Sequence, residues 1–349
     1  MSKVLKKAQL WLFSYAWAWA LCLVFSLKRE RMSHHSGITS KGRLRITKTP
    51  AFPAHDFFQP GREFPCRLRH ASASYADDTI IQVRSASLKF ADSDYDSPLD
   101  IELNTGTISL FWTARNFAEF AQQRRHRVND LAYWHYYDKH PRGLLAAEDG
   151  IRKYPASFAQ LYYHSQTATR FVGKDGVLRY AKYRLVPADR CPETGLMSKD
   201  ELRNRWKESV VPGETRPPDY LRQELVDRLA RGPVQYVLQL QLHTPQPDDS
   251  PELLNCNVAW DEATHPHMDL ATVELESILP REEGNQMRFS LFHHPPSLGL
   301  LPSEHMDDYN SLNYMRARSS VVKQLRVYLT KAWGPRERKP DERPETVRG

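Results

Sequence analysis

The sequence predicts an α+β fold built around an antiparallel β-sheet or β-barrel, and three observations indicate that class. Short runs of β-branched and aromatic residues, bounded by turn residues, follow one another through the middle of the chain. Helical patterns are inserted between these runs or appended after them, without a regular strand–helix alternation. No internal repeat and no glycine-rich phosphate loop is present. These features disfavour the nucleotide-binding folds.

The expected strands share alternation or β-branched and aromatic enrichment between turn signals. They are residues 62–72, 79–90, 107–112, 178–186, 233–243 and 287–294. Residues 233–243 alternate most strictly, with Val234, Leu238 and Leu242 on one face. Lys174-Asp175-Gly176 supplies the turn of a hairpin that ends in 178–186.

The expected helices have apolar spacing of the helical period and recognisable ends. Residues 114–127 show the spacing, and residues 216–232 begin with prolines and end at Gly232. A further helix from about Asp308 to Trp333 closes the fold. The remaining tail, residues 334–349, is rich in charge and proline and is expected to be disordered.

The N-terminal segment, residues 1–29, stands apart because residues 8–27 contain no charge. A helix of this length can span the hydrocarbon core of a bilayer. Lysines before it and basic residues after it leave an orientation undecided. Three interpretations stay open: a membrane anchor, a helix lying in the membrane interface, and a helix packed on the domain.

Composition places the chain among ordinary globular proteins. Of its 349 residues 40% are hydrophobic and 26% are charged, and the formal net charge is +7. Much of the basic excess lies at the two ends, so the sequence does not predict a nucleic-acid partner. Cys22, Cys66, Cys191 and Cys256 are far apart and form no Cys-x-x-Cys pair. The wide separation of the cysteines and the absence of an N-glycosylation sequon favour a reducing, cytosolic location.

Histidine is abundant, with 14 residues, but its spacing predicts no metal site. The close pairs are His34-His35, His265 with His267, and His293-His294, and none supplies three or four ligands. No Gly-x-Ser-x-Gly nucleophile elbow is present either.

Longer segments carry a stronger signal. "ERMSHHSG", "FPCRLRHASASYADDTIIQVRSASLKFADSDYDSPLDIELNTGTISLFW" and "DDYNSLNYMRARSS" resemble the catalase superfamily, and are most similar to its allene oxide synthase branch. The resemblance runs in order from about residue 30 to 330. It implies a catalase-like antiparallel β-barrel with flanking helices, spanning residues 30–333, around a buried haem b.

The resemblance assigns catalytic roles to three residues. His34 matches the family's distal histidine, and Asn104 in "NTG" matches the distal asparagine. Catalases tend to have valine before the histidine, whereas allene oxide synthases have threonine. Ser33 stands there in this chain, and its hydroxyl can hydrogen-bond the imidazole as threonine does. Such a bond restrains the histidine as a base toward hydrogen peroxide, and so indicates organic hydroperoxide chemistry.

Four residues match positions around the haem on this side. Arg31 and Arg69 match arginines that bind the propionates, and Phe117 and Phe120 match phenylalanines that wall the pocket. Taken singly, the phenylalanines could be helix core and Asn104 a turn residue. Their common order favours the pocket.

On the other side of the haem the chain departs from the family. There the family ligates iron with the tyrosinate of Arg-x-x-x-Tyr, whose arginine lowers the pKa of the phenol. Arg316 matches the arginine, but Ser320 stands at the aligned ligand position, and a shorter alignment places Ser319 there. Serine is a poor ligand because its alkoxide is not accessible at neutral pH. Tyr314 lies on a different face of the helix.

The family therefore implies a haem-dependent dehydratase or lyase that acts on fatty-acid hydroperoxides, in oxylipin metabolism. A lipoxygenase would supply the substrate, and the hydrophobic N-terminus suits a lipid drawn from a membrane. Two alternatives follow from Ser320: a catalase- or peroxidase-like haem protein with altered proximal ligation, and a haem-free scaffold without enzymatic activity. The expected location is cytosolic, or membrane-associated through residues 8–27.

Overall fold

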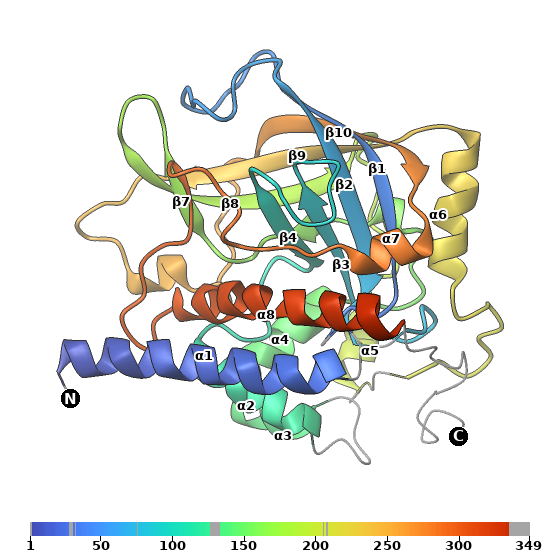
Figure 1. The fold of residues 1–349 in the computed structure, drawn as a ribbon, viewed down its shortest axis with the longest axis horizontal. Helices are drawn as coiled ribbons and strands as arrows, with labels where there is room; N and C mark the ends of the chain where they lie inside the picture. The colour runs from blue at the N-terminus through green and yellow to red at the C-terminus, as the bar shows by residue number, and fades with distance from the viewer. Residues whose placement is uncertain are drawn as a thin grey trace.

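The computed structural model describes residues 2–27, 31, 33–74, 76–125, 133–204, 206 and 209–334. Its centre is an antiparallel β-barrel of eight strands in the order β8-β6-β4-β3-β2-β1-β10-β9, closed by pairing of β9 with β8 (Figure 1). The barrel strands are β1 (Gly37–Ile46), β2 (Glu63–Ser72), β3 (Gln82–Lys89), β4 (Asp100–Thr105), β6 (Tyr163–His164), β8 (Leu178–Pro187), β9 (Val234–His243) and β10 (Met268–Ile278). Outside the barrel lie β5 (Ile151–Arg152), β7 (Thr169–Val172) and β11 (Leu298–Gly299).

The barrel is filled by side chains. Along each strand every second residue points inward, and large aliphatic and aromatic residues occupy those positions. Leu44, Leu68, Leu88, Leu238 and Leu275 are among the fully buried members of this core. The interior therefore holds the fold together, and a ligand site has to lie outside it.

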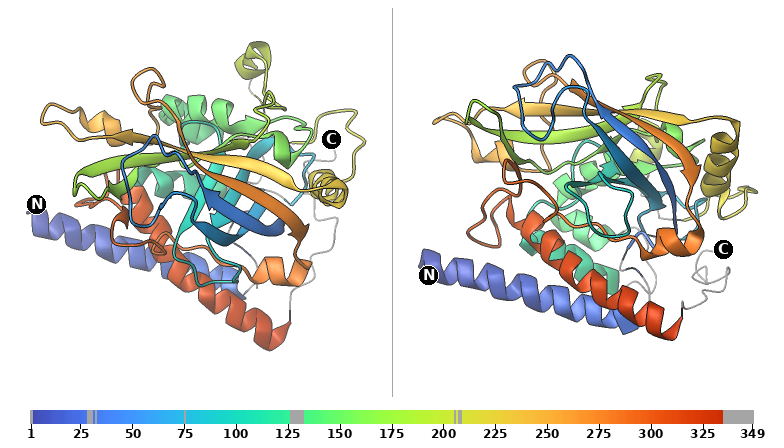
Figure 2. Two further views of the ribbon diagram at one scale, coloured as in Figure 1. Left: turned by 90° about the horizontal axis from the view of Figure 1, so that it is seen from above. Right: turned by 45° about the horizontal axis from the view of Figure 1, so that its top comes forward.

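Helices flank the barrel, most of them below it and α6 at one end (Figure 1). They are α1 (Lys3–Leu27), α2 (Ala114–Arg125), α3 (Trp134–Lys139), α4 (Pro141–Gly150), α5 (Lys199–Arg203), α6 (Tyr220–Arg231), α7 (Arg281–Gln286) and α8 (Ser311–Trp333), with short 3-10 turns at Phe158–Gln160 and Pro251–Leu254. The two longest, α1 and α8, lie side by side below the barrel (Figures 1 and 2). Within the described ranges, no helix has the length and apolar character required to cross a membrane.

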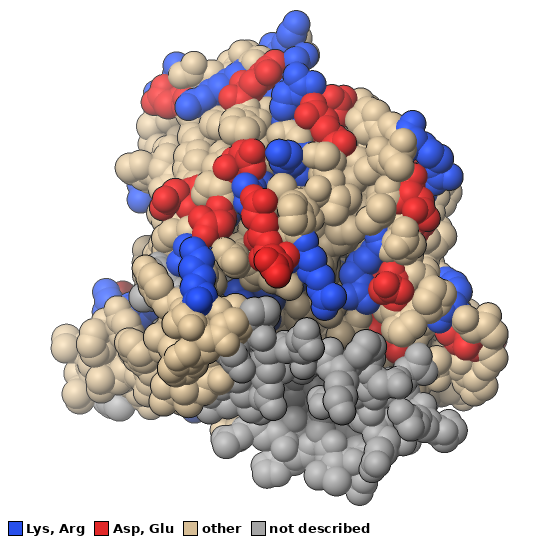
Figure 3. All heavy atoms as spheres, turned by 45° about the vertical axis from the view of Figure 1, so that its right-hand side comes forward, with Lys and Arg blue, Asp and Glu red and all other residues tan. Residues whose placement is uncertain are grey.

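Most of the predicted elements are confirmed. Strands β2, β3, β8 and β9, helices α2, α6 and α8, and the turn at Gly176, whose φ is 72°, lie where the sequence indicated. Figure 3 shows acidic and basic side chains interspersed over one face of the barrel. The expected tail lies outside the described residues, apart from Gly334.

Two predicted strands are wrong. Residues 107–112 and 287–294 are irregular, because their backbone amides bond to side chains and loops instead of to a neighbouring strand. The amide of Thr107 donates to the carboxylate of Asp149 at 2.5 Å. The amide of Ser290 donates to the carboxylate of Asp100 at 2.9 Å, and the His293 ring bonds the same oxygen.

Candidate functional site

The segment around His34 is fixed by strand β2 and by the residue that follows it, Ala73. The His34 amide donates to the carbonyl of Ala73 at 3.0 Å, and its carbonyl accepts from the guanidinium of Arg69 at 3.0 Å. These bonds hold His34 in the left-handed region, with φ of 56°, which is a costly conformation for a residue with a side chain. The position of the imidazole is therefore determined by β2, which lies about 35 residues later in the chain.

Ser33 contacts the histidine directly. Its hydroxyl oxygen lies 2.9 Å from Nδ1 of His34, so the two side chains share a hydrogen bond. If the hydroxyl accepts from Nδ1–H, the lone pair stands on Nε2 and that nitrogen is the base. If the hydroxyl donates, Nε2 carries the proton and is a donor. Either way the serine restricts rotation of the ring and ties its tautomer to a hydroxyl.

A cluster of arginines lies beside this segment, with Arg69 and Arg326 buried and Arg31 half-buried. Arg31 donates to the carbonyls of Asn285 at 3.2 Å and Met287 at 2.6 Å, and Arg326 donates to the same Asn285 carbonyl at 3.0 Å. Arg69 completes what we call the arginine cluster: Arg31, Arg69 and Arg326. Its members come from three distant parts of the chain, and α8 contributes Arg326.

The charges of this cluster are poorly compensated. Burial, followed by the charges of Arg69 and Arg326, holds the pKa of Arg31 well below its usual range. Burial and then Arg326 lower the pKa of Arg69 to about 9, and burial and then Arg288 lower the pKa of Arg326 to about 10. Among the described residues, no carboxylate forms an ion pair with the cluster, and the Nε atoms of Arg31 and Arg69 are buried without an acceptor. Such an arrangement is suited to an anion.

Arg326 was missed by the sequence reasoning. The only local signal is a basic residue in an otherwise apolar stretch of a long helix, which is usually an exposed position. The structure shows that it is 8% exposed and that it reaches the carbonyl of Asn285 in α7.

Asn104 lies on β4, between Ser85 of β3 and His164 of β6. It is half-buried, and Glu102, two residues earlier, is on the same face of the strand. The backbone turns directly after the strand, where Gly106 has a φ of 90°. The strand thus directs one amide and one carboxylate toward the helices.

The two phenylalanines of α2 enter different clusters. Phe117 packs on Trp17 of α1, with ring centroids 6.2 Å apart, and on Phe111 at 4.6 Å. Phe120 packs on Tyr133 at 4.7 Å, in the cluster around α3 and α4. Phe117 therefore lies among the helices α1, α2 and α8, and Phe120 faces α3, while Phe111 joins the two, with its ring 5.3 Å from that of Phe120.

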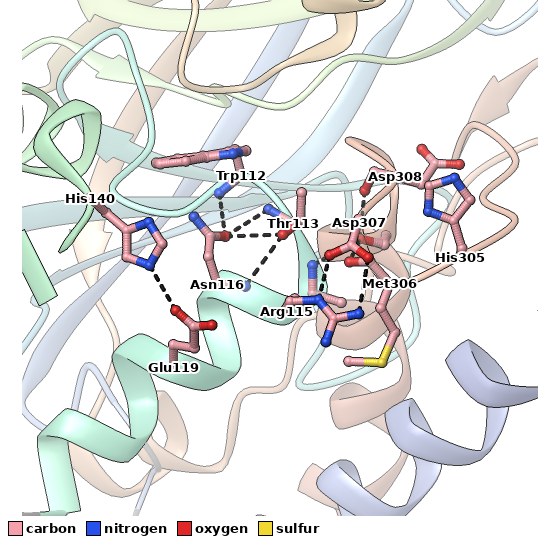
Figure 4. Close-up of polar contacts among 12 residues, drawn as sticks. Trp112, Thr113, Arg115, Asn116, Glu119, His140, His305, Met306, Asp307 and Asp308 are labelled. Carbon is pink, nitrogen blue, oxygen red and sulfur yellow. Dashed lines mark hydrogen bonds and ion pairs between the residues drawn. The ribbon is translucent and has the colours of Figure 1, made fainter. Parts of the chain in front are cut away.

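The start of α2 is fixed by polar contacts, shown in Figure 4. The Asn116 carboxamide oxygen accepts from the amides of Trp112 at 3.0 Å and Thr113 at 2.9 Å. Arg115 forms a paired contact with Asp307, at 2.5 and 3.0 Å, and so connects α2 with the loop that leads into α8. These bonds set the position of Phe117 relative to α8.

Helix α8 carries a serine pair at the position that would ligate iron. Ser320 is 1% exposed, and its hydroxyl lies 2.8 Å from that of Ser290 and 2.5 Å from the carbonyl of Ala317. Ser319 donates to the carbonyl of Arg316 at 2.7 Å. Both hydroxyls are engaged within the protein.

Arg316 bonds a carboxylate. Its guanidinium lies 2.9 Å from Glu102 of β4, and both side chains are about one-fifth exposed. In the family that the sequence resembles, the matching arginine faces a tyrosinate. Here it pairs with an acidic group from the same face of β4 that carries Asn104. A small cavity of about 40 Å³, with room for about one water molecule, adjoins this pair beside Asn313 and His293.

The histidine pairs noted in the sequence have structural partners. His265 bonds His243 at 2.9 Å, and His243 bonds Asp249 at 2.8 Å. In the part of the chain that the structure describes, no three histidine, cysteine, aspartate or glutamate side chains form a metal-binding group. Cys66, Cys191 and Cys256 are free thiols.

The residues fit a haem on one side only. The arginine cluster, with its buried Nε atoms lacking acceptors, suits the carboxylates of the group, and Ser33 with His34 suits its distal side. Helix α8 provides no phenolate at the aligned position, and its Ser320 is already hydrogen-bonded. The structure thus matches the anionic edge of a haem and lacks the expected iron ligand.

Comparison with known proteins adds independent information. No protein-family model matches the chain. The chain is 40% identical over 291 residues to the allene oxide synthase-lipoxygenase protein of Plexaura homomalla. The aligned region covers 82% of this chain and 27% of that protein. The chain therefore spans about a quarter of that relative's length. It is 30% identical over 181 residues to the uncharacterized protein y4iK of Sinorhizobium fredii, covering 50% of this chain and 78% of that protein.

A further relative and one solved structure are also similar to the chain. The chain is 27% identical over 221 residues to the catalase-related peroxidase of Mycolicibacterium paratuberculosis, covering 62% of this chain and 66% of that protein. The crystal structure of a fungal catalase matches the fold with a TM-score of 0.60 at 17% identity, over 90% of this chain and 65% of that one. With the barrel of a catalase and these relatives, the chain belongs to the catalase superfamily, close to its allene oxide synthase branch.

Proposed function

We propose that this chain converts fatty-acid hydroperoxides in a dehydratase or lyase reaction of the allene oxide synthase type. The observation that carries the proposal is the hydrogen bond of 2.9 Å between Ser33 and Nδ1 of His34. It reproduces with serine what the resemblance attributes to threonine in the allene oxide synthases. The relative at 40% identity, named allene oxide synthase-lipoxygenase protein, supports the same reaction class.

In this proposal the chain's own residues bind, orient and move protons. Arg31, Arg69 and Arg326 would hold the two carboxylates of a haem b, which when bound supplies the redox chemistry for cleaving the O–O bond. His34, held by Ser33, takes the hydroperoxide proton and returns it as the hydroperoxide loses water. Asn104 donates from β4 to orient the peroxide oxygens.

The haem binding mode is part of the proposal. Without a tyrosine at the aligned position of α8, the cluster Arg31, Arg69 and Arg326 supplies most of the binding free energy by charge-assisted hydrogen bonds. Phe117 contributes apolar surface next to α1. Phe120, whose ring lies 5.3 Å from that of Phe111, would extend this wall of the pocket.

A second candidate function rests on the proximal contacts. The ion pair between Arg316 and Glu102, together with the bond between Ser320 and Ser290, favours a catalase- or peroxidase-like haem protein with altered proximal ligation, or a haem-free scaffold. In both cases the site keeps His34 and Asn104 and lacks the tyrosinate that ligates iron in the family.

The deciding experiment uses the full chain and added haemin. A Soret band after reconstitution, followed by conversion of a polyunsaturated fatty-acid hydroperoxide faster than oxygen release from hydrogen peroxide, supports the proposal. Ser33→Val should shift this ratio toward hydrogen peroxide, whereas Ser36→Val, a nearby serine, should leave it unchanged. Absence of a Soret band removes both haem functions. Faster oxygen release by the wild-type chain selects the peroxidase-like alternative.

The substrate class implies a supplier and a place. A polyunsaturated fatty acid must first be dioxygenated, which is lipoxygenase chemistry, so a lipoxygenase is the proposed partner. The relative from Plexaura homomalla carries both names. We place the reaction in the cytosol at a membrane surface, where such fatty acids partition.

A further inference from the structure

Helix α1 is apolar on two opposite sides. One side packs inward: Leu10 and Ala18 are buried, and Trp17 contacts Phe117 of α2. The other side faces away from the protein and is also apolar. Its large members are Leu5, Leu12, Trp19, Leu23 and Leu27, each at least half exposed. We call these residues the outer stripe.

The outer stripe is continuous along the helix. Its members are spaced by seven, seven, four and four positions, which places them within about 80° of one another at 100° per residue. Ala8 and Ala16, both exposed, lie between them. No charged residue interrupts the stripe from Leu5 to Leu27. A helix that is apolar on all sides normally has both faces covered.

Within the described residues, only the inner side of α1 is covered. Helix α8 lies along it, and the Arg318 guanidinium stacks on the ring of Tyr15 at 4.2 Å. The right-hand view of Figure 2 shows α1 along the lower edge of the molecule, beneath α8. As far as the described residues go, the outer stripe therefore faces solvent.

We propose that the outer stripe docks on the surface of an anionic lipid bilayer, with α1 parallel to the membrane plane. Lys6 and Lys7 are exposed at the N-terminal end of the helix, and α1 contains no acidic residue. A leucine-rich face with tryptophan and flanking lysines is the composition of interfacial helices. The indole of Trp19 suits the headgroup level, since it combines apolar area with a hydrogen-bond donor.

The charge pattern argues against a second copy of the chain as the occupant. Two outer stripes facing each other would leave Lys6 and Lys7 of each copy without an acidic partner on either α1. A lipid headgroup layer supplies negative charge along the whole helix. At 100° per residue Lys6 lies about 100° from Leu5, at the border of the stripe, so it reaches the headgroups while the stripe enters the interface; Lys7, about 160° away, adds to the positive charge of this end.

Docking would bring the candidate site to the lipid. Ser33 and His34 follow Leu27 by only six and seven positions in the chain. The inner face of the same helix contacts Phe117 through Trp17. A fatty-acid hydroperoxide residing in the bilayer would then reach the site without crossing water. This last step rests on the proposed function, whereas the docking itself does not.

The test is flotation of the full-length protein with vesicles, without haemin or hydroperoxide. We expect binding to phosphatidylcholine vesicles containing phosphatidylglycerol, and weaker binding to pure phosphatidylcholine. Leu12→Asp should lower the partition coefficient by about tenfold or more, because a leucine no longer enters the interface. Lys6→Glu with Lys7→Glu should weaken binding to the anionic vesicles alone.

The matched control is Leu145→Asp in α4, since Leu145 is 59% exposed and Leu12 is 60% exposed. It should leave partitioning unchanged, and circular dichroism should show both variants folded. Equal partitioning of Leu12→Asp and wild type overturns the proposal. So does a failure of the wild type to bind either vesicle. Loss of a dimer in Leu12→Asp, measured by light scattering, would assign the stripe to a second copy. Hydroperoxide conversion is measured separately, so failure of either idea is recognised independently.

Discussion

Replacing Arg69 with methionine should stabilise the ligand-free protein and weaken its binding of an anionic ligand. Arg69 is 4% exposed, and burial followed by the charge of Arg326 lowers its pKa to about 9 from an ordinary value of about 12.5. At about 1.4 kcal/mol per pKa unit, holding the charge in the folded protein costs about 5 kcal/mol at pH 7. Methionine removes this cost and keeps an unbranched apolar stem.

The substitution also removes a stabilising contact. The bond from Arg69 to the carbonyl of His34, at 3.0 Å, is charge-assisted and contributes about 1.5 to 3 kcal/mol. The expected net gain in the free energy of unfolding is therefore about 2 to 3.5 kcal/mol. Haemin should stabilise the wild type markedly and the variant less, because the ligand binds the native state through the missing charge.

Urea unfolding at pH 7, with and without haemin, measures both quantities. Arg43→Met is the matched control, because Arg43 lies on β1, is exposed, and pairs with Glu276 at 2.7 Å. Its effect should stay within about 1 kcal/mol, with haemin stabilisation unchanged. A less stable Arg69→Met protein that binds haemin as tightly as the wild type would refute the reasoning.

The lowered pKa of Arg69 also predicts how the stability of the protein depends on pH. Because the pKa of Arg69 is lower in the folded than in the unfolded state, the unfolded state binds more protons between the two values. Stability of the ligand-free wild type relative to Arg69→Met is lowest below about pH 9 and rises as the pH increases above it. Measuring the difference between the two proteins cancels the other groups that titrate there.

Three further substitutions test the proximal side and its support. Ser320→Tyr should raise haem affinity in a Soret titration while costing the ligand-free protein about 1 to 3 kcal/mol through overpacking; unchanged haem content would contradict the alignment. Glu102→Gln should cost about 1 kcal/mol by breaking the pair with Arg316, and should tighten anion binding; weaker binding would show that the carboxylate orders the site. Lys89→Met should cost about 3 to 5 kcal/mol in urea unfolding, because it leaves Asp100 buried without its cation; a loss below about 1 kcal/mol would contradict this.

The sequence predicted elements whose pattern is local. Residues 233–243 alternate strictly, and they form β9 with its inward residues buried. Residues 287–294 carry similar residue types but form no strand. Asp100, almost two hundred positions earlier, takes the Ser290 amide at 2.9 Å, and Lys89 and His293 bond the same carboxylate. Because Asp100 is so distant in the sequence, the periodicity of residues 287–294 could not reveal that it replaces a neighbouring strand as the partner of the Ser290 amide.

The site divides in the same way. Ser33 and His34 are adjacent, so the resemblance could predict that their side chains meet, and they lie at 2.9 Å. Arg326 joins Arg31 only because both reach the carbonyl of Asn285, from opposite ends of the chain. The partner of Arg316 was equally out of reach, since Glu102 lies 214 positions away. Long-range polar contacts of this kind depend on the closed barrel and not on local spacing.

The arginine cluster and the α8 side of the site differ in their effect on the stability of the ligand-free protein. The arginine cluster destabilises the ligand-free protein, since buried guanidinium groups repel one another and lack acceptors for two Nε atoms. On the α8 side, Ser320 bonds Ser290 and Arg316 pairs with Glu102, so these polar groups satisfy one another without a ligand. In the proposed function, the destabilising arginines and the self-satisfied α8 side favour a haem held by its carboxylates. The affinity of the wild-type chain for haem should therefore depend more on Arg31 and Arg69 than on Ser320.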